Sequence, residues 1–268
     1  VDVLTEGVHS GDASGIVPSS FRIARRILSR LEDEVTGRVL PEWLYTEIPP
    51  ERVAQAHAMA SSLDAAIWNH YPWLEHVRPV TSDVVELILN RTWRPQLAIT
   101  GAAGLPELGL AGNVLRAGTA LRVSVRLPPG VAAERARERL ERLLTDDPPY
   151  GARVRFEGAE ASDGWNAPAL APWLEAALQE SSRVYFGAPA GYFGEGGTIP
   201  FMAMLGELFP EAQFLITGVL GPESNAHGPN EFLHLQTARK VACCVDATLE
   251  RHARQIGRAG CRERVYIS

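Results

Sequence analysis

The sequence predicts an α/β (α+β) protein in which a small α/β sandwich is followed by a segment with too few strands to form a complete domain. Three observations indicate this. Strand-like and helical patterns follow one another in the order β-α-β-β-α-β over residues 1–158, an irregular stretch at residues 37–95 interrupts that order, and a single strand is expected after residue 158. The 268 residues, 46% of them hydrophobic, can bury a substantial core in one large or two ordinary domains.

The first domain is expected to begin with a short strand and an amphipathic helix. Apolar residues from Phe21 to Leu31 recur at helical spacing, and most of the arginines between them lie on the opposite side. The elements predicted for residues 1–158 are a strand at 2–9, a loop at 10–17, a helix at 18–34, helical patterns at 50–64 and 81–91 within the 37–95 insertion, strands at 96–101, 113–116 and 119–127, a helix at 132–144 and a strand at 152–156. We assign them to one domain.

A polar linker at residues 158–166 precedes the second segment, residues 159–255. Its predicted elements are helices at 169–183, 199–208 and 230–255, a strand at 213–217, and a tail at 256–268. The strand is a continuous, largely apolar run, which is typical of a parallel strand buried on both faces. Because one strand does not make a sheet, we expect the rest of this domain to come from residues outside the sequence.

Composition and charge exclude several classes of partner. The formal net charge of -6 and the pI near 5.7 give no reason to expect nucleic acid or an anionic membrane. No apolar run approaches the roughly 20 residues that span a bilayer, and no signal-peptide pattern opens the chain. The three cysteines have neither a disulfide-framework nor a metal-finger spacing. We expect a cytoplasmic protein, and the Val1 start suggests a processed or partial chain.

Two polar, glycine-rich loops concentrate the unusual chemistry of the sequence. The first, Gly194-Glu-Gly-Gly-Thr-Ile-Pro200, combines glycines that admit close backbone approach, a carboxylate, and a hydroxyl just before a helix-starting proline. The second, Gly221–Glu231, carries His227 ahead of a long helical pattern. A lone histidine is more often structural than a ligand, but these surroundings favour His227 as a metal ligand.

In their order, these motifs resemble the C-terminal part of the M20 family of dinuclear zinc metallopeptidases, and above all its carnosine dipeptidase branch. Members of that branch carry a Gly-Gly-Ser/Thr-Ile-Pro loop, here at 196–200, and an Ala-His-Ser/Gly-x-Asn-Glu loop, here at 226–231. The resemblance implies that residues 1–158 form a ferredoxin-like lid, or dimerisation, domain and that residues 159–255 close the catalytic domain. It also implies that His227 is a zinc ligand.

The opening, metal-binding half of such a catalytic domain is not found in this sequence. None of the seven histidines is followed two residues later by aspartate, and no Glu-Glu pair occurs, although the family carries both motifs there. The resemblance implies two zinc ions that activate a water, which a glutamate deprotonates. One histidine cannot hold two zinc ions and is equally compatible with manganese or cobalt. We therefore expect this chain by itself to be inactive.

Two lid-domain positions resemble residues that act across the family's dimer. Val8-His9-Ser10-Gly11 resembles a Leu-His-Ser-Gly motif whose histidine reaches the partner subunit's site and stabilises the oxyanion. The alternative is that His9 only caps the end of a strand. Asn113 stands where carnosinase-like members have a threonine that also acts in trans. The resemblance therefore implies a homodimer formed through the lid domain.

Three further positions are candidates for substrate binding. Arg126, in Ser-Val-Arg-Leu-Pro-Pro, resembles an arginine whose planar guanidinium clamps the C-terminal carboxylate of the substrate. The alternative for Arg126 is a salt bridge at a strand end. The resemblance also implies that Glu195 and Thr198 face the substrate and that Gly197 contributes a backbone contact.

The sequence thus favours part of an M20-type metallopeptidase that hydrolyses dipeptides or similar small amides. One alternative is an M20 amidohydrolase that removes the acyl group from an N-acyl amino acid, in which case Arg126 would hold the carboxylate of that amino acid. Another alternative is a metal-free chain that retains only a dimerising and small-molecule-binding surface. Neither a nucleic acid nor a membrane is expected as a partner.

Overall fold

The computed structural model describes residues 1–194, 200–220, 224, 228–229 and 231–263 and divides into two compact units. The first unit contains Val1–Val53, Val85–Asn166 and Gly194–Ala203, and the second contains Ala54–Val84, Ala167–Phe193 and Met204–Ser268. The class is mixed α/β with small sheets, which confirms the fold class expected from the sequence. The domain limits 1–158, 159–255 and 256–268 remain a prediction.

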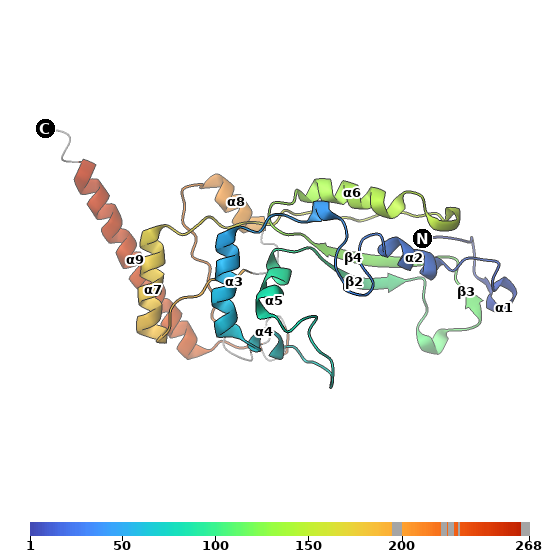
Figure 1. Ribbon diagram of the computed structural model, residues 1–268, viewed down its shortest axis with the longest axis horizontal. Coiled ribbons are helices and arrows are strands. Elements are labelled where there is room, and N and C mark those ends of the chain that lie inside the picture. Colours follow the sequence, from blue (N-terminus) through green and yellow to red (C-terminus); the bar gives the residue numbers. More distant parts are fainter. Residues whose placement is uncertain (195–199, 221–223, 225–227, 230, 264–268) are drawn as a thin grey trace. The chain divides into compact units, whose positions relative to one another are not determined.

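Two antiparallel strand pairs form the sheet structure of the first unit (Figure 1). Strand β2 (Gln96–Ala103) pairs with β4 (Ala120–Arg126), from Gln96 opposite Arg126 to Ala103 opposite Ala120, with an irregularity between Ile99 and Gly101. The second pair joins β1 (Val8–His9) to β3 (Val114–Leu115), with His9 opposite Val114. The strands expected at 96–101 and 119–127 are confirmed within two residues.

The N-terminal residues connect the two pairs. Asp2 forms antiparallel bridges with Gly118 and with Arg153. Its own amide donates to Arg153 O at 2.8 Å, whereas its neighbours Val1 and Val3 bond to the segment around Gly118. Because successive residues of an extended chain direct their backbone groups to opposite sides, Asp2 lies between Gly118 and Arg153. The pairing order is therefore the Arg153 segment, the N-terminal segment, the 117–126 segment and β2.

Two expected strands are much shorter than the sequence indicated. The strand predicted at 2–9 is reduced to a bridge at Asp2 and the two residues of β1, and the strand predicted at 152–156 is reduced to the bridge at Arg153. The loop predicted at 10–17 begins instead with a short helix, α1 (Ser10–Ala13). The reason is local: the side chain of His9 accepts from the amide of Asp12 and so caps a helical turn.

Two longer helices pack in the first unit and supply much of its core. Helix α2 (Ser20–Leu28) begins after Ser19, whose side chain accepts from the amide of Arg22, and helix α6 spans Ala133–Thr145. The helix predicted at 18–34 thus ends earlier, at Leu28. One buried cluster contains Leu31, Val39, Leu44, Val131, Ala136 and Leu140, and another contains Ile23, Ile27, Leu144 and Ala152. The buried positions of α6 recur at helical spacing, as the sequence predicted for 132–144.

Helix α6 is held at both ends by side chains that are distant in sequence. At its start, Asp163 Oδ1 accepts from the amide of Ala133 at 2.6 Å. At its end, the guanidinium of Arg30 donates to the carbonyl oxygens of Leu143 (3.1 Å), Asp146 (2.5 Å) and Asp147 (2.7 Å). A carboxylate at the N-terminus and a cation at the C-terminus both complement the helix dipole. These bonds fix α6 within the unit.

Replacing Arg30 with alanine is expected to lower the free energy of unfolding by about 2 kcal/mol, because three carbonyl oxygens lose a charged donor and water replaces only part of the interaction. Urea unfolding of the two proteins measures the difference. The matched control is Arg26→Ala, because Arg26 is an exposed arginine of α2. An equal loss in both variants would contradict the assignment of Arg30 as the cap of α6.

The segment predicted as an insertion, residues 37–95, is mainly helical. The helical patterns at 50–64 and 81–91 correspond to α3 (Pro50–Leu63) and α5 (Val84–Thr92), so both are confirmed. Among the described residues, the remaining short helices are α4 (Ala66–Asn69) and the 3-10 turns η1 (Glu42–Leu44), η2 (Leu108–Leu110) and η3 (Pro149–Gly151). None of the helices in the described part of the chain is both long and apolar enough to cross a membrane.

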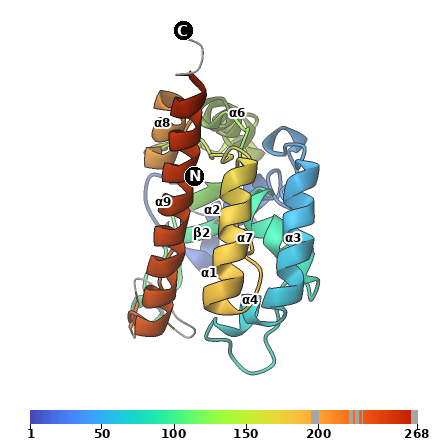
Figure 2. The ribbon, with the colours of Figure 1, turned by 90° about the vertical axis from the view of Figure 1, so that its left-hand side faces the viewer.

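Two helices pack side by side in the second unit (Figure 2). They are α7 (Pro172–Phe186) and α9 (Leu235–Glu263). The rings of Trp173 and His252 lie 5.0 Å apart between them, and Arg251 of α9 forms an ion pair with Glu180 of α7. Helix α8 spans Pro200–Leu208 and matches the predicted limits closely.

The strand predicted at 213–217 is not formed. The described residues 213–219 belong to no strand, and Leu220 makes only an isolated bridge with Leu233. A buried parallel strand needs a neighbour on each side, and the described part of the second unit offers none. Helix α9 also continues to Glu263, beyond the predicted end near residue 255. The extension contains Gly257 and Gly260, a residue type that lowers helix stability by only about 1 kcal/mol each and does not end this helix.

Candidate functional site

His9 lies at the junction of β1 and α1, with its side chain exposed. Its Nδ1 accepts from the amide of Asp12 at 3.3 Å. A Cβ added at Gly11 would lie 3.1 Å from Cε1 of the ring, so any residue other than glycine requires the ring to shift by a few tenths of an ångström. Because Nδ1 acts as the acceptor, the proton of the neutral ring resides on Nε2. The side chain of His9 therefore caps the start of helix α1, not the end of a strand as the alternative had it, and this cap leaves an N–H donor on the other nitrogen.

Asn113 lies next to His9. The amide of Ser10 donates to Asn113 O at 2.9 Å, and Val114, the following residue, is paired with His9. The side chain of Asn113 is exposed. The structure thus brings together the two residues predicted to act in trans, and both present hydrogen-bonding groups to solvent.

Arg126 lies at the opposite end of the strand pair. It is the last residue of β4, faces Gln96 across the pair, and its side chain is exposed. No ion pair or hydrogen bond of its side chain is present within the described ranges, so the salt bridge considered as its alternative role is not formed there. The seven residues of β4 span about 20 Å, and β3 lies beyond the Ala120 end of that strand (Figure 1). One chain therefore does not bring Arg126 to His9.

The remaining predicted residues, Glu195, Gly197, Thr198 and His227, lie outside the described residues. Within the residues that are described, no three His, Cys, Asp or Glu side chains are grouped in a way that could hold a metal ion. Of the residues proposed for chemistry, the structure therefore places His9, Asn113 and Arg126. The ligand role of His227 remains a prediction.

Residues 190–192, which precede the first glycine-rich loop, are held by hydrogen bonds and close packing that the sequence analysis did not predict. In the second unit, Gln179 of α7 donates from Nε2 to Ala190 O at 3.0 Å and to the Tyr192 hydroxyl at 3.4 Å. Burial raises the pKa of that hydroxyl above the ordinary tyrosine value. Gly191 lies so close to Met59 that any side chain there would collide with it. In the sequence, the two glycines of Gly191-Tyr-Phe-Gly194 could have indicated that the backbone before this loop packs closely against other residues.

Comparison with known proteins shows what this arrangement is similar to. A family model described as a peptidase dimerisation domain, M20_dimer, matches residues 1–152. A cysteinylglycine-S-conjugate dipeptidase from Corynebacterium striatum is 25% identical over 232 residues, which are 86% of this chain and 49% of that protein. The chain thus spans about half the length of this curated relative.

Solved structures show the same fold. A dipeptidase from Saccharomyces cerevisiae superposes with a TM-score of 0.66 at 18% identity, over 94% of this chain and 53% of its own. Human carnosine dipeptidase 1 has a TM-score of 0.64 at 16% identity, over 93% of this chain and 52% of its own. An M20 family metallo-carboxypeptidase from Sulfolobus solfataricus has a TM-score of 0.69 at 17% identity, over 93% of this chain and 56% of its own.

The family match covers more than half of the chain and includes His9 and Asn113 in their paired arrangement, as well as Arg126 at the end of β4. The curated relative and the solved structures extend the similarity into the second unit, and all four are peptidases by name. The chain therefore belongs to the M20 peptidase family, and residues 1–152 are its peptidase dimerisation domain.

Proposed function

We propose that this chain supplies the dimerisation domain and part of the substrate site of a dinuclear zinc dipeptidase. One observation carries the proposal: His9 is exposed on the dimerisation domain and accepts through Nδ1, which leaves Nε2–H as a donor beside Asn113. A preorganised N–H is the group needed where negative charge develops on a carbonyl oxygen. The names of the relatives favour a dipeptide as the substrate.

The proposal gives each candidate site residue of this chain its own role. Nε2–H of His9 donates to the carbonyl oxygen of the scissile amide as its charge grows, and the amide of Asn113 adds a polar contact. Arg126 binds the C-terminal carboxylate of the substrate through a planar pair of N–H donors. Glu195 and Thr198 line the substrate, and Gly197 contributes its backbone.

His227 would hold a zinc ion, since a neutral imidazole is a common zinc ligand. A single imidazole is too small a donor set for two metal ions, so the proposal requires that residues beyond these 268 supply the other ligands. When bound, the metal pair supplies a water acidic enough to attack at neutral pH. The chain without those residues is proposed to be inactive.

The distance between His9 and Arg126 supports a homodimer. A dipeptide is shorter than β4, so it cannot contact both residues when they come from one chain. A site that contains both residues therefore takes one of them from each subunit, and a two-fold dimer contains two such sites. Strand β2 suits the interface, because within the described residues it pairs with β4 alone and Ile99 is 43% exposed.

Hydrolysis assays with the complete enzyme, that is, this chain together with the residues that provide the remaining ligands, test the proposal. We expect cleavage of dipeptides such as carnosine or cysteinylglycine conjugates, loss of activity after chelation, and recovery with zinc. The 268-residue chain alone should be inactive. Cleavage of N-acetyl amino acids but not of dipeptides would indicate an amidohydrolase instead. Absence of both activities in the metal-loaded enzyme would indicate a non-catalytic dimerising protein.

A further inference from the structure

Gly194, the residue immediately before the predicted substrate loop, lies against the end of α5. Gly194 and Thr92, the last residue of α5, both belong to the first compact unit. A Cβ added at Gly194 would lie 2.9 Å from Cγ2 of Thr92, 3.3 Å from its Cβ and 3.9 Å from its Oγ1. The first of these distances is shorter than an ordinary carbon–carbon contact. The backbone at Gly194 therefore packs directly against the methyl group of Thr92.

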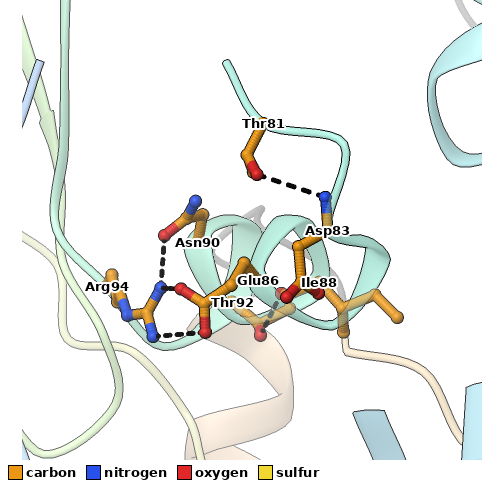
Figure 3. Close-up of polar contacts among 7 residues, drawn as sticks. All are labelled: Thr81, Asp83, Glu86, Ile88, Asn90, Thr92 and Arg94. Carbon is orange, nitrogen blue, oxygen red and sulfur yellow. Dashed lines mark hydrogen bonds and ion pairs between the residues drawn. The ribbon is translucent and has the colours of Figure 1, made fainter. Parts of the chain in front are cut away.

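The Thr92 side chain is fixed by its own helix. Its hydroxyl donates to the carbonyl oxygen of Ile88, one turn earlier, at 2.7 Å (Figure 3). A threonine whose Oγ1 bonds to the preceding turn has one preferred χ1 rotamer, so the position of the hydroxyl also determines the position of the methyl group. Thr92 is half-buried, and Ile88 itself is in the core at 5% exposure. The surface that Gly194 contacts is thus a rigid one.

A second group of bonds holds the last turns of α5. Arg94 donates from Nη1 to Glu86 Oε2 at 2.5 Å and to Asn90 Oδ1 at 2.8 Å, and from Nη2 to Glu86 Oε1 at 3.1 Å (Figure 3). The Arg94 side chain is 29% exposed, so solvent screens this two-pronged pair only in part. Arg94 follows Thr92 by two residues, and its bonds to Glu86 and Asn90 hold that end of the helix.

We infer that Thr92 is a positioning residue for the substrate loop, because its methyl group determines where the Gly194–Pro200 run begins. This inference rests on the proposed function, in which Glu195, Gly197 and Thr198 contact the substrate. Glu195 is the next residue after Gly194, so a shift of the glycine displaces the loop directly. Displacements of about 1 Å can cost a hundredfold in activity when they move binding groups out of reach. Because α5 lies within residues 37–95, the segment predicted as an insertion would then help to position the substrate loop.

The test adds a methyl group on one side of the contact and removes one on the other. Gly194→Ala is expected to raise KM for a dipeptide at least tenfold in the complete zinc-loaded enzyme, with a much smaller change in kcat. Thr92→Ser removes Cγ2 but keeps the hydroxyl that bonds to Ile88, so this variant alone should also raise KM, by about threefold or more, because the backbone at Gly194 loses the methyl group that positions it. The double variant should recover KM to near the wild-type value, since an alanine Cβ would then meet nothing closer than 3.3 Å.

Hydrogen exchange of the peptide that contains Gly194 provides a readout that does not depend on activity. Gly194→Ala should raise its exchange rate, and the double variant should restore it. The control is Gly109→Ala, because a Cβ at Gly109 would meet no atom within 4 Å and neither glycine has a positive φ. This control should change neither KM nor exchange.

The outcomes separate the inference from the proposed function. Recovery of both KM and exchange in the double variant supports the positioning role. Recovery of exchange in an enzyme that hydrolyses no dipeptide supports the contact and overturns the proposed function. A Gly194→Ala variant that matches wild type in exchange and KM, or a double variant as impaired as Gly194→Ala, overturns the inference. A fall in Tm with unchanged KM also overturns it, since the contact would then be structural only.

Discussion

Replacing His9 with alanine in the complete enzyme is expected to lower kcat for dipeptide hydrolysis by two to three orders of magnitude, which corresponds to about 3–4 kcal/mol of transition-state stabilisation. The physical reason is the loss of the Nε2–H donor, which meets charge that develops only during the reaction. KM should change little, because the neutral carbonyl of the bound substrate gains less from the same donor. Steady-state kinetics with purified variants measures both constants.

The alanine variant also removes the cap of α1, so a matched variant is needed. His9→Ser keeps an oxygen that can accept from the amide of Asp12, as serine commonly does at this position, but it has no group that reaches the substrate. We expect its Tm to stay near the wild-type value and its kcat to be as low as that of His9→Ala. If the serine variant retains kcat, the cap is the function of His9 and the oxyanion role is wrong.

Arg126→Ala is expected to raise KM for dipeptides about 30- to 150-fold and to leave kcat nearly unchanged. The guanidinium makes charge-assisted bonds to the substrate carboxylate worth about 2–3 kcal/mol, and the carboxylate has the same charge in the ground state and the transition state. Arg126→Lys should recover only part of the loss, because an ammonium is a point charge without the planar fork.

Two comparisons make the Arg126 prediction specific. Arg122→Ala removes another exposed arginine from the same strand and, four residues away, from the same face, so general electrostatic attraction would affect both variants equally. A dipeptide amide, which lacks the carboxylate, should be hydrolysed equally well by wild type and Arg126→Ala. An equal KM increase in Arg122→Ala, or a penalty that persists with the amide, would contradict the carboxylate clamp.

The longer helices and the strands β2 and β4 could be predicted from the sequence because their signals are local. The apolar spacing of α6 and the alternation in β4 match burial in the structure, with Ala136 and Leu140 buried at 3% and 8% exposure. The strand at 213–217 failed for a different reason. Its apolar residues indicated only that the segment would be buried against other elements. A strand also requires neighbouring strands to pair with, and the described residues do not provide them.

For the candidate site, the sequence indicated which residues take part but not which of them lie close together. His9 and Asn113 are 104 positions apart, and only the pairing of β1 with β3 shows that they are neighbours. The cap formed by His9, and hence the position of its proton, depends on a backbone amide that no motif specifies. The contact between Thr92 and Gly194 likewise depends on packing between distant segments, which periodicity does not encode.

The most direct test of a shared, two-subunit site is to mix the two impaired variants. His9→Ala and Arg126→Ala homodimers each lack one residue in both sites. If each site takes His9 from one subunit and Arg126 from the other, a heterodimer of the two variants has one intact site. We predict that unfolding and refolding an equimolar mixture restores about a quarter of the wild-type activity under subsaturating substrate, since half of the dimers would be mixed and each would have one working site. A mixture no more active than the sum of its parts would contradict the shared site.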